Sequence, residues 1–247
     1  ILPARVRLKL RQLFLLIRGW WFRGNTFFCP CCERHYRAFL DMKSGDSNRP
    51  NVVCPGCGVV ERHRLLRLYL ETRTDLLERP GRVLYFAPEL SMQTYFRHLP
   101  NIEYISADID SAIATEQFDI MDIPHADQSF SLIICSHVLA HVRDDQKALK
   151  ELFRILKNDG LLILLDTPAP HATTIELPEV QTPEERRAAY GQADRWRRYG
   201  QDFVQRITSV GFEVAVEKFA ETLPEPLRQK CRISNADDIY LCQKKNH

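Results

Sequence analysis

Short apolar segments alternate with helical ones between residues 82 and 166, and this alternation is the strongest constraint on the fold. The helical segments lie at about 89–98 and 144–157, and Asn158-Asp159-Gly160 is the expected stop of the second. The apolar segments are 82–87, 102–108, 130–136 and 161–166. Strands that are apolar on both faces and alternate with helices are typical of a parallel sheet covered on both sides. The sequence therefore predicts an α/β domain.

The elements around this core extend the domain to residues 61–247. An amphipathic helix is expected at 61–78, and a helix at 201–210 with strands at 212–219 and 238–243 completes the chain. Residues 167–200 hold four prolines and a charged piece, 184–199, that has helical character. Such an excursion after a strand is where α/β folds build substrate lids, so we expect 167–200 to be one.

Paired cysteines precede this domain. Two C-x-x-C knuckles, Cys29/Cys32 and Cys54/Cys57, are separated by 21 residues. That spacing is close to the one by which a ribbon places four thiolates tetrahedrally around zinc. We therefore predict a structural zinc ribbon over residues 25–60, closed because four sulfurs leave no position for water.

The other cysteines and two nearby histidines are not needed for this site. Cys31 is a spare thiol, and His35 and His63 are substitute ligands or, as the favoured interpretation, ordinary surface residues. The remaining three are expected to be buried small hydrophobes: Cys135, Cys231 and Cys242. Free thiols beside zinc indicate a reducing compartment, so we expect a cytoplasmic protein.

The first 24 residues form a basic arm. No acidic residue precedes Glu33, and the arm carries six cations, Arg5, Arg7, Lys9, Arg11, Arg18 and Arg23. Its apolar residues recur at helical spacing, which predicts an amphipathic helix. The longest uncharged stretch is six residues, far short of the roughly 20 that a membrane span needs. The apolar stripe could pack on the body, lie on the inner face of a membrane or accompany contact with a phosphate backbone, and the sequence leaves these open. The chain starts at Ile1 rather than methionine, which leaves open whether residues precede it.

Residues 118–168 resemble a known family. They read "FDIMDIPHADQSFSLIICSHVLAHVRDDQKALKELFRILKNDGLLILLDTP". This stretch is similar to the core of class I S-adenosylmethionine-dependent methyltransferases of the ubiquinone and sterol type. The segment "CPGCGVVERHRLLRLYL" also resembles a bacterial subgroup with an amino-terminal zinc ribbon. The resemblance implies a Rossmann-like seven-stranded sheet with helices on both faces and one antiparallel strand, preceded by the basic helix and the ribbon.

The resemblance also assigns cofactor contacts. The stretch "RVLYFAPELS" takes the place of the family's first strand and glycine turn, so Ala87, Pro88 and Glu89 are expected around the methionine part of the cofactor. Asp108 corresponds to the acid that accepts the ribose hydroxyls. Asp119, with the backbone of Ile120, corresponds to the adenine contact. Turn capping is the alternative role of both acids.

The resemblance also implies two sets of residues near the acceptor, one at the end of the fourth strand and one in the lid. Ser136 and His137 follow the fourth strand at the crevice where open sheets bind ligands, and His137 is the candidate general base. In the lid, side chains that could line the acceptor site are Tyr190, Arg195, Trp196 and Tyr199. The alternative for the lid piece is a solvated amphipathic helix.

Taken together, the sequence predicts an S-adenosylmethionine-dependent methyltransferase with structural zinc and an unidentified acceptor: a small molecule, a lipid or sugar, or RNA. The alternative is a non-catalytic binding or adaptor protein, which the glycine-free turn favours. Asp108, Asp119 and "CSHVLAHV" favour the enzyme.

Overall fold

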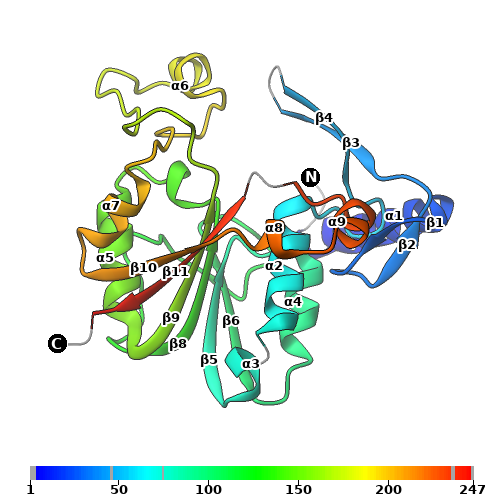
Figure 1. Ribbon diagram of the computed structural model, residues 1–247, viewed down its shortest axis with the longest axis horizontal. Coiled ribbons are helices and arrows are strands. Elements are labelled where there is room, and N and C mark those ends of the chain that lie inside the picture. Colours follow the sequence, from blue (N-terminus) through cyan, green and yellow to red (C-terminus); the bar gives the residue numbers. More distant parts are fainter. Residues whose placement is uncertain (1–3, 45–46, 74, 235–236, 246–247) are drawn as a thin grey trace.

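The computed structural model describes residues 4–44, 47–73, 75–234 and 237–245. Its centre is a seven-stranded sheet in the order β10-β11-β9-β8-β5-β6-β7 (Figure 1). Only β11 is antiparallel to its neighbours. The strands are β5 (Gly81–Phe86), β6 (Ile102–Asp108), β7 (Glu116–Gln117), β8 (Phe130–Ser136), β9 (Leu156–Asp166), β10 (Phe212–Glu217) and β11 (Asp238–Lys244). The predicted α/β fold class is confirmed, including the single antiparallel strand.

Alternate side chains of each central strand enter two separate cores. Val83 and Tyr85 of β5 pack on one face of the sheet with helices α2 (Glu61–Thr72) and α4 (Leu90–Arg97). Leu84 and Phe86 pack on the other face with α5 (Asp145–Ile155) and α7 (Phe203–Thr208). Both faces are buried, which explains why these strands are apolar throughout.

The cysteine-rich segment packs against the first of these faces. It consists of two antiparallel pairs, β1 (Arg23–Cys29) with β2 (Arg34–Tyr36) and β3 (Leu40–Ser44) with β4 (Ser47–Val53). Its buried residues continue into the core beneath α2. The short helices α8 (Phe219–Thr222) and α9 (Glu225–Cys231), which were not predicted, lie on the same side, and α9 contacts β1. The predicted boundaries 1–24, 25–60 and 61–247 remain predictions.

Three expected element boundaries were wrong. The helix expected at 61–78 ends at Thr72, and α3 (Asp75–Glu78) is separate. Asn158-Asp159-Gly160 does not end α5, which stops at Ile155; the tripeptide instead bulges within β9. The helix expected at 184–199 is only α6 (Pro183–Tyr190), because Gly191 adopts a left-handed conformation with φ of 83° and ends it.

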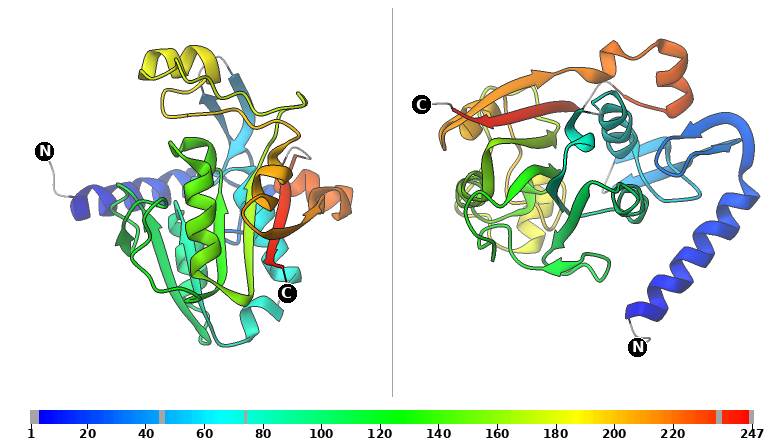
Figure 2. Two further views of the ribbon diagram at one scale, coloured as in Figure 1. Left: turned by 90° about the vertical axis from the view of Figure 1, so that its left-hand side faces the viewer. Right: turned by 90° about the horizontal axis from the view of Figure 1, so that it is seen from below.

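The amino-terminal helix α1 (Ala4–Trp21) does not bury its apolar stripe on the body. Figure 2 shows it projecting from the rest of the molecule. Only Leu15 and Gly19 are buried among its described side chains, while Trp20 and Trp21 are 62% and 66% exposed. Body packing of the stripe, one of the three interpretations left open, is therefore wrong. Among the described residues, no helix is long and apolar enough to cross a bilayer.

Candidate active site

A pocket of about 570 Å³ opens at the carboxyl ends of the parallel strands. Figure 1 shows α6 and the β3–β4 hairpin projecting beyond this edge of the sheet from opposite sides. Residues from both of these segments line the pocket, together with residues from α2 and from the loop before β11. The polar side chains that matter below are Arg49, Arg62, His137, Asp166, Arg195 and Asp237. The ribbon therefore contributes directly to the wall of this pocket.

His137 sits at the floor of the pocket, directly after β8. Its φ of 53° turns the chain sharply, and its backbone N–H donates to Leu165 O at 2.9 Å. Its Nε2 lies 3.1 Å from Asp237 Oδ1, and its Nδ1 lies 4.0 Å from Asp166 Oδ1. Asp237 also accepts from Thr167 Oγ1 at 2.8 Å. The hydrogen bond with Asp237 thus orients the imidazole and a second carboxylate lies near its other nitrogen, an arrangement that suits a proton acceptor.

The charge state of Asp237 fits that role. Burial alone would raise the pKa of Asp237, but the hydrogen bond from His137 and the nearby Arg62 together lower it below its ordinary value of 3.8. Asp237 is therefore ionised at neutral pH. Sequence reasoning missed this residue, because an acid preceding the last strand is brought to His137 only by the antiparallel insertion of β11.

The pocket wall is rich in arginine. Arg62 and Arg195 each have a buried Nε with no hydrogen-bond partner among the described residues. Arg198 lines the same wall and its side chain is exposed. Arg49 is engaged by Glu61 at 3.2 Å. Because the cations exceed the two carboxylates and some lack partners, the wall is suited to an anionic group.

The glycine-free turn keeps the backbone conformation that usually requires glycine. Ala87 has φ of 50°, in the left-handed region, and its N–H donates to Ala107 O at 2.9 Å. Ala87 is exposed at the end of β5 and Pro88 is buried beneath it. Alanine is the smallest residue that can hold this turn without being glycine, so the chain bends here as the family resemblance requires.

Glu89 is held by two buried neighbours. Tyr85 Oη donates to Glu89 Oε2 at 2.7 Å, and His63 Nε2 lies 2.7 Å from Oε1. Burial would raise the pKa of Glu89, but His63 and Tyr85 lower it below 4.5. The carboxylate therefore fixes the turn after β5 to α2.

The expected surface position of His63 is wrong. The sequence favoured a surface residue, yet its side chain is 8% exposed. Its Nδ1 accepts from Val60 N–H at 3.2 Å, which leaves Nε2 to donate to Glu89. Burial lowers the pKa of His63 below 6.5, and Glu89 only partly opposes this. The helical spacing of α2 predicted its apolar face, but it carried no signal for a buried histidine.

The expected ribose and adenine acids lie at strand ends and cap their own turns. Asp108 Oδ1 accepts from the N–H groups of Asp110 and Ser111 at 2.9 and 2.8 Å. Asp119 Oδ1 accepts from Met121 N–H at 2.8 Å, and Ile120 is buried beside it. Turn capping, the alternative role, is thus present, and their contacts with a cofactor stay predictions.

Ser136 adds an observation that points to a ligand. It is the last residue of β8, its side chain is buried, and its Oγ has no hydrogen-bond partner among the described residues. A buried hydroxyl without a partner is costly unless a ligand or water satisfies it. Its place beside the turn of β5, in the neighbouring strand, is where the resemblance expects the cofactor.

The lid residues do not share one environment. Tyr190 and Arg195 line the pocket. Tyr199 also borders it, but its ring is 3% exposed and its hydroxyl donates to Asp145 at 2.8 Å, so it supports the lid from the core. Trp196 is not part of the pocket wall, and its ring centroid lies 4.4 Å from Cζ of Arg186 and 5.9 Å from Cζ of Arg143. Acceptor contacts by these residues remain predictions.

The base of the lid is pinned to the domain. Arg197 is fully buried and donates to the carbonyls of Leu139 and Val142, each at 2.7 Å, within and just after the 3₁₀ helix η1 (Leu139–His141). It also pairs with Glu176 at 2.8 Å, on the other limb of the excursion. The segments before and after α6 are therefore joined where the lid leaves the domain, and α6 lies above the pocket (Figure 1).

The four predicted zinc ligands converge. The Sγ atoms of Cys29, Cys32, Cys54 and Cys57 all lie within 4.8 Å of one another. The closest pairs, Cys29 with Cys57 and Cys32 with Cys54, are both 3.7 Å apart. That separation suits the edges of a thiolate tetrahedron around a zinc ion with bonds of about 2.3 Å. Cys31 lies outside this group, and the isolated cysteines at 135, 231 and 242 are buried as expected.

Comparison with known proteins agrees with this architecture. Residues 55–164 match the family model described as a methyltransferase domain. The demethylmenaquinone methyltransferase of Lactobacillus johnsonii is 36% identical over 69 residues, which is 28% of this chain and 28% of that protein. The match therefore spans little more than a quarter of the relative's length.

Solved structures share the fold at low sequence identity. The 1,6-didemethyltoxoflavin-N1-methyltransferase of Burkholderia thailandensis, solved with S-adenosylhomocysteine, is 12% identical with a TM-score of 0.50 over 74% of this chain and 79% of that one. The [4+2]-cyclase SpnF is 15% identical with a TM-score of 0.52 over 85% and 87%. The predicted class I methyltransferase fold is confirmed, residues 55–164 carry the match to the methyltransferase-domain family, and the cyclase illustrates that the fold alone does not fix the reaction.

Proposed function

We propose that this protein, whose residues 55–164 match the methyltransferase-domain model, transfers a methyl group from S-adenosylmethionine to an anionic acceptor. The observation that carries the proposal is the meeting of the glycine-like turn at Ala87, the unpartnered Ser136 hydroxyl and the oriented His137 along one edge of the sheet. Ligands of open α/β sheets bind at this edge.

The cofactor would lie across the ends of β5, β6 and β8. Ala87 allows close approach of the backbone, Asp108 offers the carboxylate oxygen not used in its turn, and Ser136 Oγ supplies a hydrogen-bonding group. Asp119 and Ile120 would border the adenine. The bound cofactor supplies an electrophilic methyl group.

His137 would accept the proton that the acceptor loses. With Nε2–H donating to Asp237, the lone pair of Nδ1 would be free to take the proton, and Asp166 at 4.0 Å would stabilise the imidazolium that results. The proton would therefore end on Nδ1, and the acceptor atom that lost it would take the methyl group as the bond between that group and the sulfonium sulfur of the cofactor breaks.

The acceptor's anionic group would be held by Arg62, Arg195 and Arg198. Their excess charge favours a phosphate or carboxylate, and bidentate guanidinium contacts would orient it. A small molecule, a lipid- or sugar-linked group and RNA all satisfy this requirement.

Calorimetric titration with S-adenosylmethionine and S-adenosylhomocysteine tests cofactor binding. We expect both ligands to bind, and Asp108→Ala to weaken binding by roughly tenfold or more, as for the loss of a charged hydrogen bond. Asp159→Ala, in the exposed bulge of β9, is the matched control. Absence of heat from either ligand with folded protein would sink the proposal and favour the non-catalytic adaptor.

Transfer of labelled methyl groups from the cofactor to a cell extract tests the proposed base. We expect His137→Gln to lower labelling by roughly a hundredfold, and Asp237→Asn to lower it less, since positioned proton transfer contributes about 10²- to 10⁴-fold. Both variants should keep their affinity for S-adenosylhomocysteine. Unchanged labelling would remove His137 from the chemistry.

We also propose that the four-cysteine cluster holds a structural zinc ion. The geometry of the four sulfurs is the support, and the small size of the ribbon explains the need for a metal staple. Metal analysis should find about one zinc per chain, as a closed four-sulfur site requires. Cys54→Ser should lose it, whereas Cys242→Ser, in the opposite core, should not. A folded, metal-free protein would contradict this.

A further inference from the structure

We propose that α1 and the adjoining ribbon surface bind an anionic phospholipid bilayer. Val6, Leu10, Leu13 and Ile17 follow one another at spacings of four, three and four residues, so they form one stripe along the helix. Phe14 and Trp21 widen the stripe on one side, and Leu16 and Trp20 on the other. All eight side chains are 39–66% exposed. We call these eight residues the outer face of α1.

The opposite side of the helix is fastened to the ribbon. Leu15 and Gly19 are buried there, and Arg18 Nε donates to Pro55 O in the second knuckle at 2.8 Å. A side chain at Gly19 would lie 2.9 Å from Gly56 Cα, so the two backbones are in close contact. The outer face therefore points away from the body, as Figure 2 shows for the helix as a whole.

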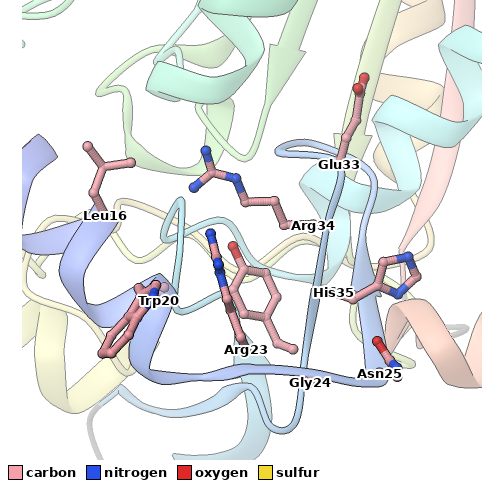
Figure 3. Close-up of a pocket in the computed structure, with 10 residues that line it drawn as sticks. Leu16, Trp20, Arg23, Gly24, Asn25, Glu33, Arg34 and His35 are labelled. Carbon is pink, nitrogen blue, oxygen red and sulfur yellow. The ribbon is translucent and has the colours of Figure 1, made fainter.

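Cations border the outer face on both sides. Arg7 and Arg11 are exposed along one border, and Lys9 lies on the other. Beyond the second border is a pocket of about 540 Å³ between the end of α1 and the β1–β2 pair. Figure 3 shows Leu16 and Trp20 on its helix side and Arg23 and Arg34 opposite them. We call it the basic pocket.

The basic pocket is suited to a phosphate headgroup. Neither Arg23 nor Arg34 has an ion pair within the described part of the chain, and both side chains are exposed. The single acid on the wall, Glu33, pairs with Arg67 at 3.2 Å. A headgroup placed here would have its acyl chains beside Trp20 and Leu16, on the outer face.

The combination favours a lipid surface over RNA or protein. Five of the eight residues of the outer face are aliphatic, which a membrane interior accepts and a phosphate backbone does not need. Tryptophans at the end of the stripe suit the interface between headgroups and acyl chains. The helix carries cations and no acidic residue, which matches anionic lipid. It would lie flat, since it is not apolar enough to span.

Sedimentation with vesicles tests the inference on the full, zinc-loaded chain. We expect binding to phosphatidylcholine vesicles that contain phosphatidylserine, and much weaker binding to pure phosphatidylcholine or at high salt. Leu13→Ser/Ile17→Ser should weaken binding by at least about tenfold. Arg23→Gln/Arg34→Gln should weaken it by roughly fivefold for each charge removed.

The controls distinguish binding through the outer face of α1 from non-specific adsorption through exposed apolar residues. Val216→Ser removes an exposed apolar residue, 44% exposed, from β10 and should leave vesicle binding unchanged. Failure of the wild-type chain to bind anionic vesicles would overturn the proposal, as would equal loss in the control. Binding to a single-stranded RNA oligonucleotide but not to vesicles would assign the surface to RNA instead. A dimer in sedimentation velocity that is lost in Leu13→Ser/Ile17→Ser, without vesicle binding, would assign it to a second copy.

Discussion

Replacing Arg64 by methionine is expected to lower the free energy of unfolding by about 3 kcal/mol. Arg64 is fully buried in α2 and donates to four backbone carbonyls. Its Nε reaches Cys231 O at 2.6 Å, and its terminal nitrogens reach Val52 O at 2.8 Å, Val59 O at 3.2 Å and Arg232 O at 3.1 Å. One side chain thus joins α2, the ribbon and α9.

The magnitude follows from what each carbonyl loses. Val59 O also accepts from Cys54 N–H at 2.9 Å and so keeps a partner, and the other three carbonyls are counted as the loss. At about 1–1.5 kcal/mol for each of three hydrogen bonds, the loss is about 3–4.5 kcal/mol. Methionine fills most of the side-chain volume and removes a costly buried charge, which offsets part of the loss and brings it to about 3 kcal/mol.

Urea unfolding monitored by tryptophan fluorescence, with zinc held constant, measures this change. The matched control is Arg34→Met, an exposed arginine of the ribbon, for which we expect a change within about 0.5 kcal/mol. If Arg64→Met changes the unfolding free energy by less than about 1 kcal/mol, the four carbonyl contacts do not stabilise the junction and the reasoning is wrong.

Two further changes test other contacts. His63 is neutral when folded because burial lowers its pKa below 6.5, so stability should be full above about pH 6.5 and decline as pH falls toward the lowered value. His63→Gln should flatten this decline relative to His35→Gln in unfolding measured across pH; equal slopes would refute it. A side chain at Gly56 would lie 1.8 Å from Tyr36 Oη, so Gly56→Ala should cost about 1–3 kcal/mol in urea unfolding. Adding Tyr36→Phe should recover part of that loss, and full additivity of the two changes would contradict the clash.

The sheet was predictable because burial on both faces leaves a strong local signal. Apolar segments at 102–108 and 130–136 coincide with β6 and β8. The wrong element boundaries lie where local signals compete. Asn158-Asp159-Gly160 resembles a helix stop, but these residues form a bulge in β9 where it pairs with β8. The short helices α8 and α9 have little periodicity to detect, because their stability comes from packing of α8 on α2 and β11 and of α9 on β1.

The candidate site was predictable only in part. His137 and Ser136 could be placed because a strand end in a parallel sheet marks the ligand edge. Asp237 and Arg62 could not, since they reach His137 and the pocket wall from distant segments. Periodicity indicates which face of an element is buried, but it does not say which polar groups meet across elements.

By itself, the sequence determined the four-cysteine cluster, the α/β sheet and the basic, apolar character of α1, because knuckle spacing, strand hydrophobicity and composition are local properties. Tertiary structure alone decided where these parts point. It placed the β3–β4 hairpin of the ribbon at the pocket, joined buried His63 to the turn after β5 through Glu89, and turned the stripe of α1 outward. These outcomes depend on contacts between segments far apart in the chain, and such contacts leave no periodic trace in the sequence.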